Sequence, residues 1–361
     1  MNNTVPLISD TIYYIISAVL VLGVLLGIYL MSKVNSSVKG NTISAVSMVL
    51  AIITVLLKYE VFSAQQLIFV VLGLAIGSVI GLIISKKVKM IQMPQVVALL
   101  NGFGGGASAI VGAVTIAKSG FEKVTSVLAV VVGTVTLIGS LVAASKLQGI
   151  ISPRPKVYKG HKLITTCTLI LSIVACILPL FIRDKVISVI ILVFAIVVAA
   201  LFGYFFSIRV GGADMPITIS LLNSFSGVAG SIAGLAIGDA LLVAIGGIVG
   251  ASGLILTQIM CRAMNRHLFD ILLGKTSVTA KPAPVANKTE SEDNKTETEQ
   301  VVDKKITPAE EAADILKDAK NIIIIPGYGM ALGQAQSLVK QLSDKLEANG
   351  ANVRFAIHPV A

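Results

Sequence analysis

Residues 215–261 read MPITISLLNSFSGVAGSIAGLAIGDALLVAIGGIVGASGLILTQIMC, and Asp239 is the one charged side chain among them. The charge-free parts on either side, 215–238 and 240–261, are each long enough to cross a hydrocarbon layer of about 30 Å as an α-helix. The segment therefore predicts two membrane spans joined by a tight turn.

Further charge-free stretches lie on the amino-terminal side of this segment. They run over 11–32, 40–57, 61–85, 90–117, 124–145, 163–182 and 186–208, which gives nine predicted spans in all. Of the 361 residues, 55% are hydrophobic and 13% are charged, with a mean hydropathy of +0.89. Soluble domains carry about 25% charged residues. This composition therefore excludes an ordinary soluble domain as the description of the whole chain. We expect a mainly α fold, a polytopic membrane helix bundle.

The net charge of +10 could indicate binding to nucleic acid, but the placement of the basic residues indicates the orientation of the chain in the membrane instead. Loops after the odd-numbered spans hold fourteen basic residues: Lys33, Lys39, Lys86, Lys87, Lys89, Lys146, Arg154, Lys156, Lys159, Lys162, Arg209, Arg262, Arg266 and Lys275. The opposite side holds five: Lys58, Lys118, Lys123, Arg183 and Lys185. The positive-inside rule then predicts an external amino terminus and a cytoplasmic carboxyl-terminal region, with the bilayer and not nucleic acid as partner.

The spans contain an internal repeat. Residues 93–110, MPQVVALLNGFGGGASAI, align without a gap with residues 215–232, MPITISLLNSFSGVAGSI, and nine of the eighteen positions are identical. Both segments open spans of the same predicted direction, so the relation is a parallel repeat, an arrangement known in transporters. The repeat is the first place to look for a path across the membrane.

Asn101 and Asn223 occupy the same position in the two repeats. By helical rise they lie about 18 Å beyond Lys89 and about 13 Å beyond Asp214. An amide in hydrocarbon needs hydrogen-bond partners, so the two side chains either join helices or hold water in a proton path. The duplication favours a proton path.

Asp214, Ser140 and Ser252 are the other candidates for a proton path. Asp214 lies at the mouth of span eight, where it is either functional or a solvated loop charge. The two serines lie near glycine-rich stretches, which themselves favour close helix packing, and a serine can also bond a carbonyl of its own helix.

Histidine is the side chain best matched to proton exchange near neutral pH, and the sequence places none in a span. His161 is assigned to a loop, His267 follows span nine and His358 ends the last predicted strand. The titrating group is then expected to be Asp214, a coordinated water or a residue of a partner chain.

The three cysteines, Cys167, Cys176 and Cys261, show no CxxC spacing. They predict no disulfide framework, haem attachment or metal site.

Beyond the spans the chain changes character. Residues 276–305 are rich in Thr, Lys, Glu and Pro, which is typical of a flexible linker. From Thr307 the pattern predicts a helix starting at Pro308, followed by a βαβ unit with its strands at 321–325 and 352–357 and its helix at 334–348. One such unit cannot cover both faces of a parallel sheet. We therefore expect a transmembrane domain over 1–275, a linker over 276–305, and over 306–361 an incomplete, apparently truncated α/β Rossmann-like domain.

The turn after the first of these strands reads Pro326-Gly327-Tyr328-Gly329-Met330-Ala331. Glycines between a strand and a helix let backbone N–H groups approach a pyrophosphate, although an unspecific α/β turn remains an alternative. The second strand ends without the acid that an NAD site usually places on the ribose. The unit therefore favours NADP over NAD.

Together these pieces resemble the beta subunit of the proton-translocating NAD(P) transhydrogenase. The resemblance covers essentially the whole chain and is carried by Met93-Pro94 through Asn101, Gly211-Gly212-Ala213-Asp214-Met215-Pro216, Leu222-Asn223-Ser224, Gly250-Ala251-Ser252-Gly253, Met260-Cys261-Arg262-Ala263-Met264-Asn265-Arg266, Pro326 through Ala331, and His358-Pro359-Val360-Ala361. Some family members have a proton-path histidine where this sequence has Asn101, so that role cannot be transferred intact.

The resemblance implies a multi-pass subunit of the inner membrane that couples proton translocation to hydride transfer between NAD(H) and NADP(H). It also implies an alpha subunit that binds NAD(H), and a dimer of such heteromers. NADP(H) would be bound by Gly327, Tyr328, Gly329, Met330, Ala331, His358, Pro359 and Val360. The alternatives are a secondary transporter with a nucleotide-sensing cytoplasmic tail and a membrane anchor for a soluble oxidoreductase.

Overall fold

The computed structural model describes residues 8–61, 63–89, 92–116, 120–182, 184–263, 267–268, 308–327, 330 and 335–357. The chain divides into two compact units, Met1–Thr276 and Ser277–Ala361. Each unit is described by itself below. The predicted linker lies outside the described residues.

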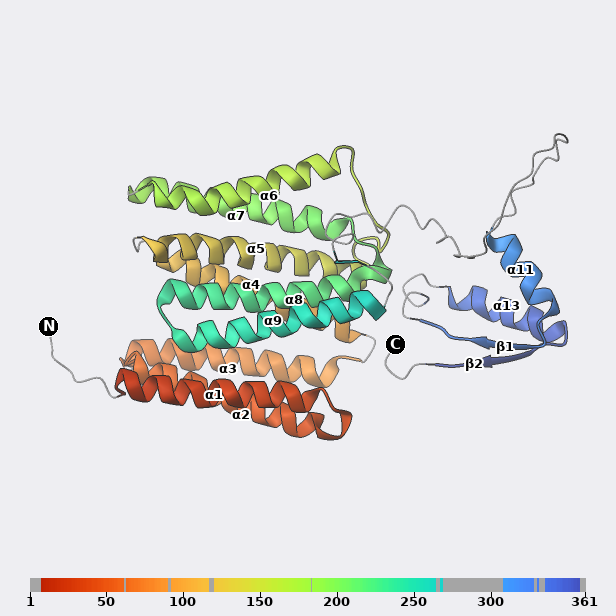
Figure 1. The fold of residues 1–361 in the computed structure, drawn as a ribbon, viewed down its shortest axis with the longest axis horizontal. Helices are drawn as coiled ribbons and strands as arrows, with labels where there is room; N and C mark the ends of the chain where they lie inside the picture. The colour runs from red at the N-terminus through yellow and green to blue at the C-terminus, as the bar shows by residue number, and fades with distance from the viewer. Residues whose placement is uncertain are drawn as a thin grey trace, which may run out of the picture. The chain divides into compact units, whose positions relative to one another are not determined.

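Nine helices of the first unit, among the described residues, are long and apolar enough to cross a membrane. They are α1 (Asp10–Met31), α2 (Ser37–Lys58), α3 (Ala64–Lys87), α4 (Met93–Thr115), α5 (Phe121–Leu147), α6 (His161–Ile177), α7 (Lys185–Ile208), α8 (Met215–Ile237) and α9 (Ala240–Ala263). The prediction of nine apolar, membrane-capable helices is confirmed (Figure 1).

The helix ends follow from short polar residues and prolines. The side chains of Ser9, Ser63 and Asp184 cap α1, α3 and α7 by accepting a backbone N–H of the first turn, which satisfies a donor that the helix leaves free. Pro94 and Pro216 occupy the first turns of α4 and α8, where a missing N–H is harmless. The two repeats thus begin their helices in the same way.

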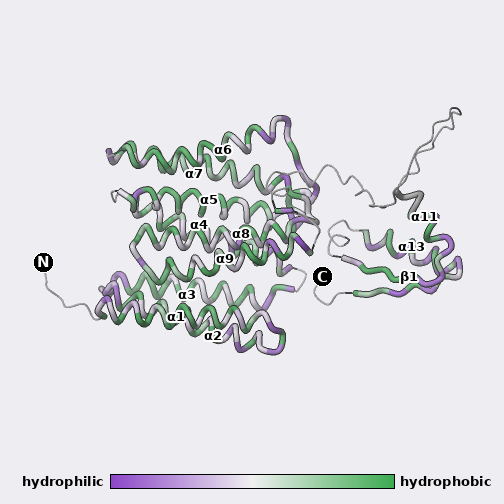
Figure 2. Tube along the Cα trace, in the orientation of Figure 1, coloured by the Kyte–Doolittle hydropathy of each residue, from purple (hydrophilic) through white to green (hydrophobic). Residues whose placement is uncertain are grey.

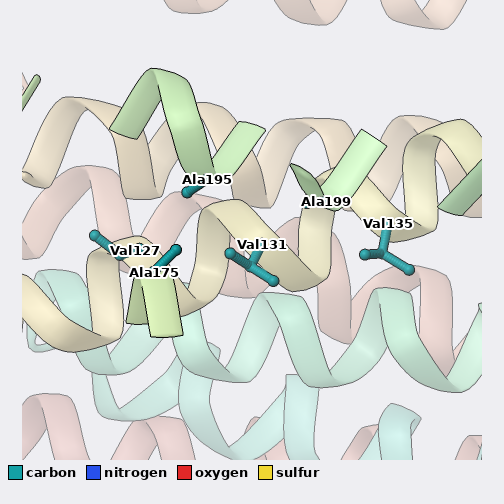
Figure 3. Packing of buried hydrophobic residues seen from close by; sticks show 6 residues of the cluster. All are labelled: Val127, Val131, Val135, Ala175, Ala195 and Ala199. Carbon is teal, nitrogen blue, oxygen red and sulfur yellow. The ribbon is translucent and has the colours of Figure 1, made fainter. Parts of the chain in front are cut away.

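Helix α5 is the centre of this unit and contacts α4, α6, α7 and α8. On one side, valines of α5 pack against alanines of α6 and α7, as Figure 3 shows; the cluster is Val127, Val131, Val135, Ala175, Ala195 and Ala199. The helices of this unit consist largely of hydrophobic residues (Figure 2). Many of their large apolar side chains are exposed in the structure, which suits a surface covered by lipid.

Glycines allow the closest helix contacts. A Cβ built on Gly105 would lie 2.8 Å from the carbonyl oxygen of Gly133, and one built on Gly227 would lie 2.4 Å from the amide nitrogen of Gly250. These contacts join α4 to α5 and α8 to α9 at backbone distance. Most of the small residues in the spans therefore serve packing, as the sequence indicates.

One prediction was wrong: His161 is the first residue of α6 and is buried. Its Nε2 lies 3.0 Å from the carbonyl oxygen of Phe205 at the end of α7. The predicted span begins at residue 163 and so leaves His161 in the preceding loop, whereas the imidazole packs against Phe205 at the end of α7. Its place at the first residue of α6 still puts it at one end of the bundle.

In the second unit, α11 (Pro308–Asp318) precedes β1 (Asn321–Ile324), α13 (Gln336–Ala348) and β2 (Asn352–Phe355). The strands are parallel and pair Asn321 with Asn352 and Ile324 with Phe355. The βαβ unit is confirmed (Figure 1). Two short strands do not distinguish a Rossmann-like domain from other α/β folds, so that assignment stays a prediction.

Candidate proton path and nucleotide site

The two repeats form α4 and α8, which contact each other and both contact α5. Gln95, near the start of α4, donates to the carbonyl oxygen of Leu147 at the end of α5 over 2.8 Å. Lys146, also at the end of α5, donates to the carbonyl oxygen of Ile208 at the end of α7, just before α8 begins. Helices α4 and α8 therefore start at the same end of the bundle, called here the Asp214 end, and run in the same direction.

Asn101 is buried between the two repeats. Its Nδ2 donates to the carbonyl oxygen of Ile219 on α8 over 3.2 Å, and 7% of the residue is exposed. Ile219 lies one helical turn before Asn223, which is itself partly buried. The structure thus brings the first asparagine onto the backbone of the helix that carries the second, and it shows Asn101 joining two helices.

Ser140 lies on α5 directly beside this contact. A Cβ built on Gly102, the neighbour of Asn101, would lie 3.0 Å from the Cβ of Ser140. Ser140 is completely buried, and its hydroxyl oxygen has no hydrogen-bond partner among the described residues. Leaving a buried hydroxyl unpaired costs about 1–3 kcal/mol. This position is therefore suited to a bound water molecule that would form a hydrogen bond with the Ser140 hydroxyl.

Ser207 on α7 repeats this property, although the sequence analysis did not select it. Its hydroxyl is completely buried and without a partner among the described residues. A Cβ built on Gly139, next to Ser140, would lie 3.0 Å from the Ser207 oxygen. A serine in an apolar span gives no sequence signal of its own, and only the helix packing reveals the pair.

Ser252 behaves as an ordinary helix serine. Its hydroxyl donates to the carbonyl oxygen of Val249 in its own helix over 3.0 Å. The serine that bridges helices here is Ser224, next to Asn223, which donates to the carbonyl oxygen of Gly250 over 2.6 Å. Of these two serines, the contacts therefore favour Ser224, which lies beside Asn223 within the second repeat, as a polar group of the candidate path.

Asp214 is buried, with 5% of the residue exposed. It ends the short 3₁₀ turn η4 (Gly212–Asp214) and immediately precedes α8. The segment between α5 and α6 covers this turn, and the amide nitrogen of Gly212 donates to the carbonyl oxygen of Pro153 over 2.9 Å. A solvated loop charge is therefore the wrong description of Asp214, because burying a carboxylate demands specific compensation.

The opposite end of the bundle, called here the Asp239 end, holds a cluster that the sequence analysis did not single out. Asp239 is 1% exposed and accepts hydrogen bonds from the hydroxyls of Tyr13 and Tyr59. Nearby, Lys58 forms an ion pair with Asp10. The one available signal was that Asp239 interrupts two apolar stretches, since a charge there needs partners.

In the second unit, β1 leads into the predicted nucleotide turn. The amide nitrogen of Met330 donates to the carbonyl oxygen of Gly327 over 3.0 Å. Among the described residues, a Cβ built on Gly327 would have no neighbour within 4 Å, which is compatible with a ligand approaching this backbone. Tyr328, Gly329, Ala331, His358, Pro359 and Val360 lie outside the described residues.

Comparison with known proteins identifies the family. Residues 10–361 match the family described as NAD(P) transhydrogenase beta subunit. Two relatives are both named NAD(P) transhydrogenase subunit beta and come from Rhodospirillum rubrum, one of them from a designated strain. Each is 35% identical over 366 residues, covering 96% of this chain and 73% of the relative. A match of this extent includes both the helical bundle and the βαβ unit, and the chain therefore belongs to the NAD(P) transhydrogenase beta subunit family.

Proposed function

We propose that this chain is the beta subunit of a proton pump that couples hydride transfer between NAD(H) and NADP(H) to proton translocation. The observation that carries the proposal is the polar contact inside the bundle. Asn101, Ser140 and the Asn223 region of α8 adjoin one another across three packed helices. Polar groups are costly to bury in an apolar bundle, and polar residues inside a membrane segment are candidates for a functional site.

In this proposal, Asn101 and Asn223 orient water within the bundle, and Asp214 exchanges the proton at the mouth of α8. A side-chain amide both donates and accepts hydrogen bonds but does not titrate near neutral pH. Asp214 does carry a titratable group, and its burial suits a role in which the gain or loss of a proton changes the local structure.

The described residues of the second unit fit an NADP(H) site at the turn after β1. No described residue lies within 4 Å of a Cβ built on Gly327, which supports the approach of a pyrophosphate to the backbone there. Gly329, Met330 and Ala331 are the further proposed ligands of this site. Bound NADP(H) supplies the hydride acceptor or donor. A partner alpha subunit binds NAD(H), and the two together form a dimer of heteromers.

Coupling between the units is conformational. The membrane unit acts by changing the population of a nucleotide-binding state. One elementary charge crossing 100 mV contributes about 2.3 kcal/mol, which shifts an equilibrium roughly forty-fold. A shift of that size is enough to favour binding or release of NADP(H).

We also propose that the amino terminus is outside and the second unit cytoplasmic, because the basic residues gather at the Asp214 end. Protease added to inside-out membrane vesicles should cut the 276–305 linker, whereas protease added to right-side-out vesicles should spare it. The reverse pattern would overturn this orientation.

The pump is tested by reverse transhydrogenation in sealed vesicles containing the complete protein and its alpha partner. The reaction should change the internal pH, and an uncoupler should change its rate. Uncoupler-insensitive turnover without a pH change would exclude the pump. Proton-coupled solute uptake without transhydrogenation would instead support a secondary transporter with a nucleotide-sensing tail.

A further inference from the structure

The buried end of α5 carries a lysine that the proposed proton path does not use. Lys146 is 1% exposed. Its ammonium donates to the carbonyl oxygens of Ile208 over 2.5 Å and Val210 over 2.7 Å, with a third, longer contact of 3.3 Å to that of Arg154. The three N–H groups of the ammonium thus match three acceptors, and each acceptor is a backbone carbonyl oxygen.

The location explains why an ammonium is suited to this site. Helix α7 ends at Ile208, and the last carbonyls of a helix have no partner within the helix. A cation near them is further favoured by the helix dipole. Lysine is a compact point charge with three rotatable donors, which fits carbonyls that converge from two segments.

Lys146 thereby holds two segments together: the strap, residues 148–160 between α5 and α6, and the Asp214 turn, residues 209–214. Further backbone hydrogen bonds connect the same segments, from Lys156 nitrogen to Ile208 oxygen over 3.2 Å and from Gly212 nitrogen to Pro153 oxygen over 2.9 Å. The chain between Val210 and Asp214 is only a few residues long. Its position is therefore set by the ammonium at one end and by α8 at the other.

The same helix also carries Ser140, six residues before Lys146, or about 9 Å of helical rise. A straight helix transmits position well over such a short distance. Helix α5 therefore contacts the Asp214 turn through Lys146, and it contacts Gly102, the neighbour of Asn101, through Ser140.

We infer that Lys146 is a positioning residue that fixes Asp214 relative to α5, and so aligns it with the polar groups of α4 and α8. This inference rests on the proposed role of Asp214 in proton exchange. It assigns to Lys146 no proton transfer of its own, because the three hydrogen-bond partners of its ammonium are backbone carbonyl oxygens, which accept hydrogen bonds and do not take up a proton.

Helix α5 supplies a matched control at its other end. Lys123 is 7% exposed and donates to the carbonyl oxygen of Ile182 over 2.7 Å. It is likewise a buried lysine bonded to a backbone carbonyl beside α7, but it lies far from Asp214. Replacing it removes the same charge from the same helix.

The experiment uses the complete protein with its alpha partner and compares Lys146→Met with Lys123→Met. We expect K146M to lower kcat of reverse transhydrogenation about tenfold or more, with KM for NADP changed less than twofold. K123M should retain kcat even though its unfolding temperature falls by as much as that of K146M. Equal effects of the two variants on kcat would overturn the inference and leave Lys146 as a structural cap.

A double-mutant cycle separates action through Asp214 from a general loss of structure. Asp214→Glu displaces the carboxylate by one methylene. If Lys146 acts by positioning Asp214, K146M should reduce kcat much less in the D214E background than in the wild type, whereas any effect of K123M should multiply with that of D214E. Independent, multiplying effects of K146M and D214E would contradict the inference.

Lys146→Arg and Lys146→Gln complete the design. Arginine keeps the charge and the donors, so K146R should recover part of the lost kcat, and a rate equal to that of K146M would count against positioning by the cation. If K146M does not accumulate in membranes, K146Q replaces it in the cycle. Failure of the wild-type protein to couple protons to hydride transfer would refute the proposed function itself, which is a separate outcome.

Discussion

The hydroxyl of Tyr13 donates a hydrogen bond to Oδ2 of Asp239 over 2.7 Å, which joins α1 to the turn between α8 and α9. The hydroxyl of Tyr59 donates to the same oxygen over 3.1 Å, and the amide nitrogen of Leu242 donates to Oδ1 over 2.7 Å. One buried carboxylate therefore caps α9 and receives phenols from both helices of the α1–α2 hairpin. We interpret Asp239 as the polar anchor of that hairpin on the bundle.

Tyr13→Phe tests this anchor. The change removes one of the two phenols that donate to Oδ2 of Asp239, and losing a hydrogen bond to this charged group should lower the free energy of unfolding by about 1.5–3 kcal/mol. Tyr14→Phe is the control, because Tyr14 is 57% exposed on the same helix. Thermal unfolding in detergent should separate the two variants; equal unfolding temperatures would show that Asp239 does not anchor α1.

The same anchor predicts a pH dependence. Burial, followed by the negative charge of Asp239, raises the pKa of Tyr59 to about 12 from its usual 10. In the unfolded chain the phenol loses its proton near pH 10, so its contribution to stability is complete below that pH and is lost as the pH rises towards 12. The unfolding temperature of the wild type should thus fall more steeply above pH 10 than that of Tyr59→Phe, and parallel curves would contradict the assignment.

The sequence predicted the helical unit well because each span is defined by a local absence of charge. It also placed Asn101 in the interior of an apolar helix, where the structure has it in α4, since position along a helix follows from counting residues. The burial of Asp214 could not be predicted, because it depends on the strap folding back over a glycine turn. The bond between Tyr13 and Asp239 joins positions 226 residues apart, and no periodicity in either segment indicates the other.

Gly227→Val should disrupt the contact between α8 and α9. The added Cβ would lie 2.4 Å from the amide nitrogen of Gly250, and backbone cannot move aside as a side chain can. Overpacking of this kind costs about 1–3 kcal/mol or more. Gly73→Val in α3 is the control, because none of the residues described by the structure would lie within 4 Å of a Cβ there. If both variants unfold at the wild-type temperature, the close approach of α8 and α9 is not required for stability.

Gly327→Val should weaken NADP binding without disturbing the fold. Within the part of the chain that the structure describes, a Cβ built on Gly327 meets nothing within 4 Å, but a valine would obstruct a pyrophosphate that approaches the turn. Calorimetry on the complete protein should show at least a tenfold loss of NADP affinity with an unchanged unfolding temperature. If the Gly327→Val variant binds NADP with wild-type affinity, this turn is an unspecific α/β connection and not part of the nucleotide site.

The two asparagines of the repeat should differ in what they tolerate. Asn101 donates to the carbonyl oxygen of Ile219, a contact that needs an N–H donor rather than an amide as such. Asn101→His keeps a donor and should preserve proton-coupled turnover in part, whereas Asn101→Leu leaves a polar acceptor facing an apolar side chain. The two variants thereby distinguish the need for a donor from the need for an amide.

Asn223→Leu is the decisive change of the pair, because Asn101 already has a partner in the helix backbone and Asn223 is only partly buried beside it. In the proposed path its amide orients water, and its loss should reduce proton translocation at least tenfold while membrane insertion and NADP affinity stay within twofold of the wild type. Proton uptake by sealed vesicles during reverse transhydrogenation measures this effect. If the leucine variants of Asn101 and Asn223 both translocate protons at the normal rate, the two residues only join helices, and the path must be sought along Ser140, Ser207 and Asp214.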